Sequence, residues 1–237
     1  MAGDSVSEDR EGVSGGRCVV STDKVRVITL SEYDMKQCVD FSVESAKTQQ
    51  DIEFGQRDTA PRGTREIARD NVIGKMAEVA IAHMLREDFG VRCTVNYDIY
   101  PLCKGDDCDL QINGWNIDVK STRTGRWLLI EADRLRMRKH QTGNNLPDAI
   151  FMCRTPWDRD RDSPRGTVEL IGAVSLGTLL HARWLPKGAV IPGTNVRLQA
   201  ANYGIPFSEI NGNWGEIIPY MISNRPPDRT AFLIPGA

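Results

Sequence analysis

Two acids and one lysine stand close together within residues 105–121, where polar and apolar residues alternate. Asp109 opens one alternating run, and Asp118 and Lys120 belong to the next. Successive side chains of a β-strand point to opposite faces, so a hairpin would bring these three side chains onto one face. Paired carboxylates hold divalent cations through oxygen. An ammonium group beside such a cation suits the hydrolysis of a phosphodiester by metal-bound water.

Each of these groups has an expected role. We expect Asp109 and Asp118 to bind Mg2+, with the backbone carbonyl of Val119 as a further ligand and Mn2+ as a substitute ion. Lys120 would orient the attacking water and stabilise the negative charge that develops on the phosphate. The alternative is an ordinary ion pair between Asp118 and Lys120 on a solvated face of the sheet.

The acids need a hairpin and a neighbouring helix to hold them in place. Asn113-Gly114 lies between the two runs and is a strong signal for a two-residue hairpin turn. Apolar residues repeat at helical spacing over 64–89 and Gly90 supplies a stop, which predicts a long helix. Gly74 would either let this helix pack closely on the sheet or divide it in two. Glu78, at the edge of the apolar stripe, could point its carboxylate toward the sheet.

The rest of the pattern predicts strands mixed with helices. The polar residues 1–16 lack periodicity and are expected to be a disordered leader, and the stretch after residue 182 is typical of irregular structure with short strands. The expected strands are 25–30, 93–99, 109–113, 116–121, 127–131, 149–154 and 168–174, and the other expected helices are 32–49, 132–141 and 175–182.

Size and composition set the broad class of the protein. With 237 residues, of which 40% are hydrophobic, we expect one domain over 17–237 with its core at about 64–182. The formal charge of -2 does not favour a protein that coats nucleic acid, so binding to DNA would depend on local groups of arginine. No apolar stretch approaches the length of a membrane span, and we expect a cytoplasmic protein.

The six cysteines are scattered along the chain rather than densely spaced as in a disulfide framework. Reduced thiols are therefore expected. Zinc binding by Cys93, Cys103 and Cys108 stays open, although their spacing matches no common zinc finger.

Glu78, Asp109 and the run Ile117-Asp118-Val119-Lys120 resemble the signature of the PD-(D/E)XK nuclease superfamily, over about residues 70–180. The resemblance implies an α/β fold with a restriction-endonuclease-like core, in which a central mixed β-sheet is flanked by helices. In that core a helix is followed by a three-stranded meander, a second helix and a further strand. The chain departs from the pattern because Cys108 replaces the proline of the motif and the gap between the two acids is short. Asp106 and Asp107 are rival candidates for the first acid.

The resemblance also implies an activity and its residues. It implies an Mg2+-dependent endodeoxyribonuclease that cuts duplex DNA by direct attack of water and leaves 5'-phosphate ends. The catalytic set would be Asp109, Asp118, Lys120 and Glu78, with Glu78 binding the metal through water or positioning the lysine. A homodimer would suit the cutting of two strands. The alternative is a catalytically inactive DNA-binding or assembly protein, and branched DNA or RNA stay open as substrates.

Residues that would contact DNA flank the proposed site. Basic residues beside a phosphodiester position its backbone, and Gln111 shares the face of Asp109. The alternative for each arginine is a solvated helix surface with ion pairs to nearby acids. The candidates are Arg62, Arg65, Arg69, Gln111, Ser121, Arg123, Arg126, Arg134 and Arg138.

Overall fold

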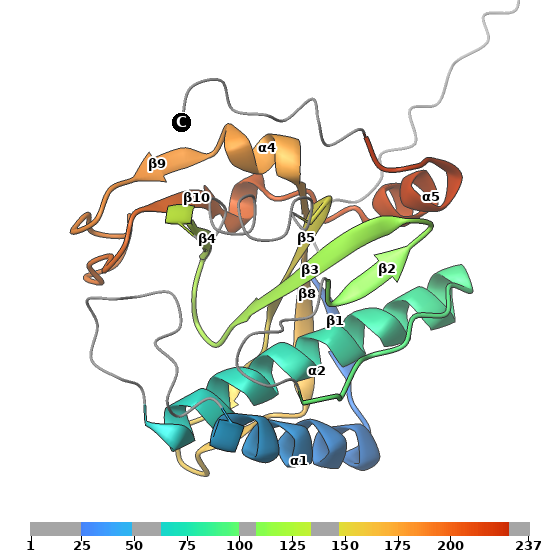
Figure 1. Ribbon diagram of the computed structural model, residues 1–237, viewed down its shortest axis with the longest axis horizontal. Coiled ribbons are helices and arrows are strands. Elements are labelled where there is room, and N and C mark those ends of the chain that lie inside the picture. Colours follow the sequence, from blue (N-terminus) through green and yellow to red (C-terminus); the bar gives the residue numbers. More distant parts are fainter. Residues whose placement is uncertain (1–24, 49–62, 100–107, 134–146, 228–237) are drawn as a thin grey trace, which may run out of the picture.

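A computed structural model of the chain describes residues 25–48, 63–99, 108–133 and 147–227 (Figure 1). Several predictions fall outside these ranges: the leader at 1–16, Cys103, Asp106, Asp107, Arg62, Arg134, Arg138 and most of the helix at 132–141. The elements are β1 Arg26–Thr29, α1 Glu32–Thr48, α2 Thr64–Phe89, β2 Leu110–Ile112, β3 Trp115–Thr122, β4 Trp127–Glu131, β5 Ala149–Arg154, β6 Trp157–Asp158, β7 Ser163–Pro164, β8 Thr167–Ser175, α4 Leu176–Leu180, β9 Arg183–Leu185, β10 Asn202–Pro206, the 3-10 helix η1 Phe207–Glu209 and α5 Trp214–Ser223.

The fold is mixed α/β, as the sequence predicts. Five strands form one mixed sheet in the order β1-β8-β5-β3-β2, in which β3 and β5 are parallel and the other neighbours are antiparallel. A second sheet has the order β4-β10-β9, and β6 and β7 form a short hairpin. No helix among the described residues is long and apolar enough to cross a membrane.

The two faces of the large sheet are covered by different elements. On one face, α2 packs its apolar stripe onto Ile117, Val119 and Phe151, together with residues of α5. On the other face, Ile150 and Met152 of β5 pack against α4 and against β4 and β10 of the small sheet. Since side chains alternate along a strand, the even-numbered residues of β3 point to the face that carries the small sheet.

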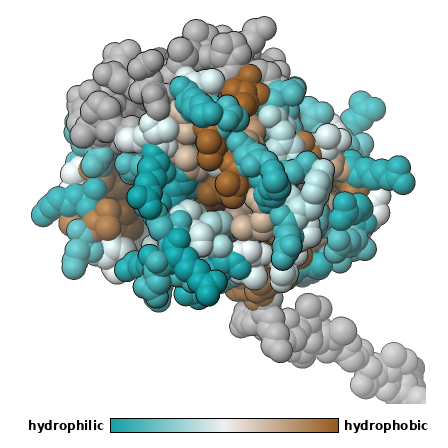
Figure 2. All heavy atoms as spheres, turned by 90° about the horizontal axis from the view of Figure 1, so that it is seen from below, coloured by the Kyte–Doolittle hydropathy of each residue, from teal (hydrophilic) through white to brown (hydrophobic). Residues whose placement is uncertain are grey.

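The outer side of the helical layer is formed by α1, which packs on α2 (Figure 1). Seen from this side, the surface is mostly hydrophilic around a small hydrophobic strip (Figure 2). On α1, Val39 and Val43 lie one turn apart and are 40% and 45% exposed. The α1 side is therefore largely hydrophilic but carries an exposed apolar strip.

The hairpin between β2 and β3 turns at Asn113 and Gly114, as predicted. Their φ angles of 45° and 84° are both positive, as a two-residue hairpin turn of type I′ requires. The Asn113 amide donates to the carbonyl of Ile222 at 2.9 Å, and the Trp115 indole donates to the carbonyl of Asn224 at 2.8 Å. These bonds tie the hairpin to the end of α5.

Some sequence predictions are wrong. The segment 93–99 is not a strand. The helix at 64–89 is confirmed but is not divided at Gly74, and a Cβ at Gly74 would meet nothing within 4 Å, so close packing does not explain the glycine either. The region after 182 contains α5, a helix that holds Pro219. Trp214, Ile218 and Met221 of this helix are buried in the main core, which outweighs the proline.

The meander implied by the family resemblance is also wrong in its third strand. β4 does not pair with β3 and instead pairs with β10 in the small sheet. The chain turns away from the large sheet at 123–126, and Leu128 and Ile130 are buried in a second core between the sheets. Among the described residues, no other strand pairs with the edge of β3 beyond the end of β2. Side chains therefore lie along this edge.

Candidate active site on the β2–β3 hairpin

Asp109, Asp118 and Lys120 come together on one face of the hairpin. The ladder ends where Leu110 pairs with Ile117, and just beyond it the Asp109 backbone N–H donates to the Ile117 carbonyl at 3.1 Å. The bond that its carboxylate accepts from the Val119 N–H brings Asp109 beside Asp118, and Lys120 follows Asp118 by two residues on the same face of β3. The three side chains thus converge at the open end of the β2–β3 ladder.

Hydrogen bonds hold the cluster in a defined arrangement. Asp109 Oδ2 accepts a bond from the Val119 backbone N–H at 2.6 Å, and Asp118 Oδ1 accepts from Lys120 Nζ at 2.5 Å. The carboxyl groups of Asp109 and Asp118 also share a hydrogen bond. The Asp118 side chain is 9% exposed and the Lys120 side chain is 34% exposed. The ion pair exists, but it does not lie on a solvated face.

The electrostatics of the pair favour a proton or a cation between the two acids. Burial raises the pKa of Asp109 from 3.8 to about 6, and the negative charge of Asp118 also acts to raise it, against the lowering effects of Lys120 and the Val119 N–H. Two adjacent carboxylates with little solvent cannot both ionise without compensation. A divalent cation would supply that compensation in place of the shared proton.

The donor set fits Mg2+. This ion is typically bound by one or two carboxylates, with water and substrate oxygens completing its shell, and the two acids provide the protein ligands. The backbone groups of Val119 are directed toward β2, as its bond to Asp109 indicates, so its carbonyl points to the same edge. Within the described ranges, no group of three or more His, Cys, Asp or Glu side chains could hold a metal ion. Asp109 and Asp118 are therefore the two side-chain ligands that this site offers.

The Glu78 carboxylate contacts a different group from Asp109, Asp118 and Lys120. Its carboxylate pairs with Lys75 Nζ at 2.6 Å, and the same ammonium donates to the Asn96 carbonyl at 2.7 Å and lies 4.5 Å from the ring centroid of Phe41 on α1. α2 covers the face of the sheet opposite to Asp118 and Lys120. Sequence periodicity identified the stripe that Glu78 borders, but not the buried lysine one turn before it.

Two further polar candidates take different places. Gln111 shares the face of Asp109 and donates from Nε2 to Asn116 Oδ1 at 3.0 Å. Ser121 has the opposite parity to Lys120, and its hydroxyl hydrogen bonds to Thr155 at 2.9 Å. Thr155 in turn donates to the Ile73 carbonyl of α2 at 3.4 Å. Gln111 therefore borders the cluster, whereas Ser121 faces the helix.

The arginines that the structure describes form two groups. Arg65 and Arg69, at the start of α2, both pair with Asp162 of the β6–β7 hairpin, and Arg69 lies 5.6 Å from the ring centroid of Trp157. Arg123 and Arg126 lie in the turn that follows β3, where Arg126 is exposed and Arg123 is half-buried. The turn group is thus the one next to the end of the strand that carries Lys120.

Asp148 is a buried acid that sequence reasoning missed. It precedes β5, and its carboxylate accepts from the Asn116 backbone N–H at 2.7 Å while its own N–H donates to the Asn116 carbonyl at 2.8 Å. These bonds lock the start of β5 against β3 and fix the register that sets Asp118 beside Ile150. β5 is apolar and buried on both faces, so no polar–apolar alternation marked Asp148 in the sequence.

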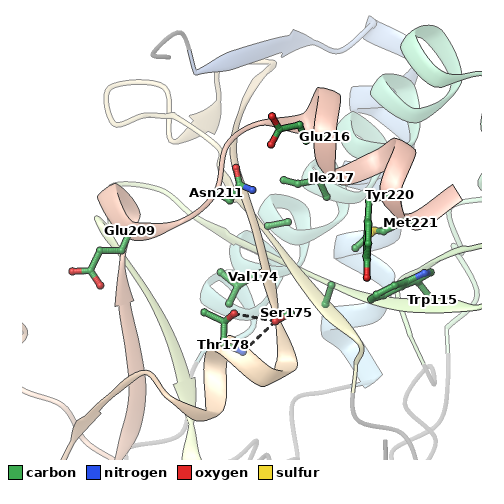
Figure 3. Close-up of a pocket in the computed structure, with 12 residues that line it drawn as sticks. Trp115, Val174, Ser175, Thr178, Glu209, Asn211, Glu216, Ile217, Tyr220 and Met221 are labelled. Atoms are coloured by element: carbon green, nitrogen blue, oxygen red, sulfur yellow. Dashed lines mark hydrogen bonds between the residues drawn. The ribbon is translucent and has the colours of Figure 1, made fainter. Parts of the chain in front are cut away.

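A pocket of about 450 Å³ lies elsewhere, at the other end of β3 (Figure 3). Trp115 and Tyr220 form one side, and Ser175 and Thr178 form another. The hydroxyls of Ser175 and Thr178 bond to each other at 3.0 Å, and Ser175 caps α4 through the Thr178 N–H. Neither Asp109, Asp118 nor Lys120 lines this pocket, so it is separate from the acid cluster.

Cys38, Cys93, Cys108 and Cys153 form no disulfide within the described part of the chain. Cys93 donates to the Gln111 carbonyl at 3.2 Å, which links the segment after α2 to β2.

No family model, no curated protein and no solved structure matches this chain. The assignment of a function therefore depends on the geometry of the site itself.

Proposed function

We propose that this protein is an Mg2+-dependent endodeoxyribonuclease that hydrolyses duplex DNA. The observation that carries the proposal is the convergence of Asp109, Asp118 and Lys120 at the open end of one β-ladder, with Asp109 and Asp118 sharing a hydrogen bond. A structural ion pair needs one acid. Ionising a second buried carboxylate beside the first costs free energy, and a cation held by both acids would offset this cost.

The acids and the lysine would have separate roles in the hydrolysis. Asp109 and Asp118 would hold Mg2+, with the carbonyl of Val119 at the same edge, and the bound ion would supply the charge that activates water and polarises a phosphoryl oxygen. Lys120 keeps a third of its side chain in solvent, so its ammonium can turn from Asp118 to a phosphate oxygen. There it would stabilise the charge that develops during hydrolysis.

The order of elements supports a restriction-endonuclease-like core. A helix, α2, precedes the hairpin that carries the acids, and β5 follows as a strand parallel to β3. The departures are the position of β4 in the second sheet, Cys108 in place of proline and Glu78 in its contact with Lys75. The proposal therefore assigns catalysis to three side chains and gives Glu78 a structural role.

The DNA backbone would lie along the end of β3. Arg123 and Arg126 are in the turn directly after this strand, where their charges can contact phosphates on either side of the cut. Arg65 and Arg69 are paired with Asp162 and contribute less, because an arginine with a carboxylate partner must exchange it for phosphate. Two copies of the chain, one for each strand, would produce a double-strand cut.

Cleavage assays test this proposal. Supercoiled plasmid, linear duplex and single-stranded DNA are incubated with the protein in Mg2+ or in EDTA, beside Asp118→Asn, Lys120→Met and the control Asp40→Asn on exposed α1. We expect cutting of duplex in Mg2+ alone, a loss of about a hundredfold or more in the two site variants, and no loss in the control. Binding of DNA without any cutting by the wild type would instead support the DNA-binding or assembly protein.

A further inference from the structure

The strands β9 and β10 and the loop between them lie in an acid-free stretch of the chain. Residues 170–208 contain no Asp or Glu, although the whole chain has 32 acids in 237 residues. The same stretch carries Arg183, Lys187 and Arg197, and all three are exposed. The acid-free stretch is thus locally positive in a chain whose net charge is -2.

An aromatic ring lies among these charges. Trp184 on β9 is 50% exposed, and it pairs across the ladder with Tyr203 of β10, with ring centroids 5.3 Å apart in an edge-to-face contact. The contact with Tyr203 orients the indole while half of its surface stays open. The open half of the indole therefore lies on the edge strand of the small sheet.

The positive charges are held on ordered backbone. Arg183 lies 5.3 Å from the ring centroid of Trp127 and pairs with Glu209 at 2.6 Å. Val190 and Arg197 form a β-bridge, and Arg197 Nη1 donates to the Gly188 carbonyl at 3.1 Å. We call the exposed group formed by Arg183, Trp184, Lys187 and Arg197 the Trp184 surface.

We propose that the Trp184 surface binds single-stranded nucleic acid. An unpaired base has a free face that can stack on the open indole, and the basic residues can contact the phosphates of the same strand. A paired base in a duplex offers no such face to a side chain. Arg183 is paired with Glu209 and contributes less, so Lys187 and Arg197, within the acid-free stretch, supply most of the charge that complements phosphate.

The Trp184 surface also has a defined relation to the acid cluster. β3, which carries Asp118 and Lys120, leads through the turn at 123–126 into β4 of the small sheet (Figure 1). The small sheet packs on Ile150 and Met152, the register partners of Asp118 and Lys120. A single strand on the Trp184 surface would therefore lie on the same side of the large sheet as the acids. Binding there goes beyond the proposed nuclease activity and does not require it.

Fluorescence anisotropy with a labelled oligothymidine in EDTA tests this inference. We expect Trp184→Ala to weaken binding about tenfold and Trp184→Phe to weaken it less, because the loss is that of one stacked base. The matched control is Tyr33→Ala, which removes a 69% exposed ring on α1. Thermal unfolding of each variant checks that the fold is kept, and Trp184→Phe serves if the alanine variant is unstable.

A salt titration separates stacking from charge. The double variant Lys187→Gln, Arg197→Gln should reduce the slope of log K against log salt by about 0.7 for each phosphate that it no longer binds. Equal affinity of wild type, Trp184→Ala and this double variant for the oligonucleotide, or no binding by the wild type, would overturn the inference. Asp118→Asn should bind the oligonucleotide as the wild type does. A wild type that binds through Trp184 but never cuts DNA would contradict the proposed nuclease alone.

Discussion

Asp109 and Asp118 lie side by side at the open end of the β2–β3 ladder, and their carboxyl groups share a hydrogen bond. The ammonium of Lys120 donates to Asp118 at 2.5 Å, so one positive charge faces two acids. When both carboxyl groups are ionised, they carry one more negative charge than this ammonium balances. The behaviour of the pair with pH and with divalent cations is therefore the most informative property of the site.

The stability of the folded chain should depend on the proton of Asp109. Its pKa is raised from 3.8 to about 6, so the folded chain keeps this proton at pH values where the unfolded chain has released it. The stabilising contribution is complete below pH 3.8 and is lost as the pH rises through about 6. In EDTA, the free energy of unfolding of the wild type should fall relative to that of Asp109→Asn across this window.

Urea unfolding of both proteins between pH 3.5 and pH 8 measures this difference, with pH limits chosen to span roughly both pKa values. Asp109→Asn keeps an oxygen that can accept from the Val119 N–H, so the backbone bond is retained. A constant difference between the two proteins over the whole range would show that Asp109 has an ordinary pKa in the fold.

The pKa of Asp109 should move in opposite directions in two neighbouring variants. Asp118→Asn removes a negative charge that raises this pKa, so the value should decrease. Lys120→Met removes a positive charge that lowers it, so the value should increase. The pH dependence of the Asp109 carboxyl 13C chemical shift reports both values. Shifts in the same direction would mean that the three groups do not interact as the geometry requires.

Lys75 and Glu78 should matter for stability rather than for cutting. Their side chains are 6% and 12% exposed, and Lys75 also contacts Phe41 and the Asn96 carbonyl. Lys75→Met removes the cation from a buried pair and should lower the free energy of unfolding by about 3–5 kcal/mol. The double variant Lys75→Met, Glu78→Met should lose less than the sum of the single variants. Chemical unfolding of the three variants measures both differences, and additive losses would mean that the two side chains do not interact.

Glu78→Gln distinguishes this structural role from the one that the family resemblance implies. The variant should cut DNA in Mg2+ at close to the wild-type rate, because Glu78 pairs with Lys75 on the helical side of the sheet. Loss of cutting with unchanged thermal stability would instead assign Glu78 to the metal site.

Asp148 should stabilise the junction of β3 and β5. It is 3% exposed, and its carboxylate accepts from the Asn116 N–H at 2.7 Å. Asp148→Ala should cost about 1–3 kcal/mol of unfolding free energy, the penalty of a buried donor without its acceptor. Asp148→Asn keeps one acceptor oxygen and should cost less. Thermal unfolding compares the two, and an unchanged alanine variant would mean that another group accepts from Asn116.

Features that depend on neighbours in the chain could be predicted from the sequence. The turn at Asn113-Gly114 follows from two residues that tolerate positive φ, and α2 follows from its apolar repeat and from Gly90, whose φ of 65° ends the helix. The shared face of Asp118 and Lys120 follows from strand alternation alone. These local rules were enough to identify the acid cluster.

Features that depend on distant partners could not be predicted. The alternation of β4 fits either sheet, and only Tyr203 and its neighbours, more than seventy positions later, decide that it pairs with β10. α5 depends on burial of Trp214 and Ile218 in a core formed much earlier in the chain, so Pro219 was misleading. The side of the sheet on which Glu78 lies depends on how α2 packs, which periodicity does not specify.

The binding of Mn2+ to the protein tests the central claim most directly, because free Mn2+ gives a paramagnetic resonance signal that disappears on binding. We predict that the wild type removes this signal at neutral pH, with the ion held by the two acids, and that Asp109→Asn and Asp118→Asn do so much more weakly than the control Asp40→Asn. Equal reduction of the signal by all four proteins, or no reduction by the wild type at millimolar concentrations, would contradict the account.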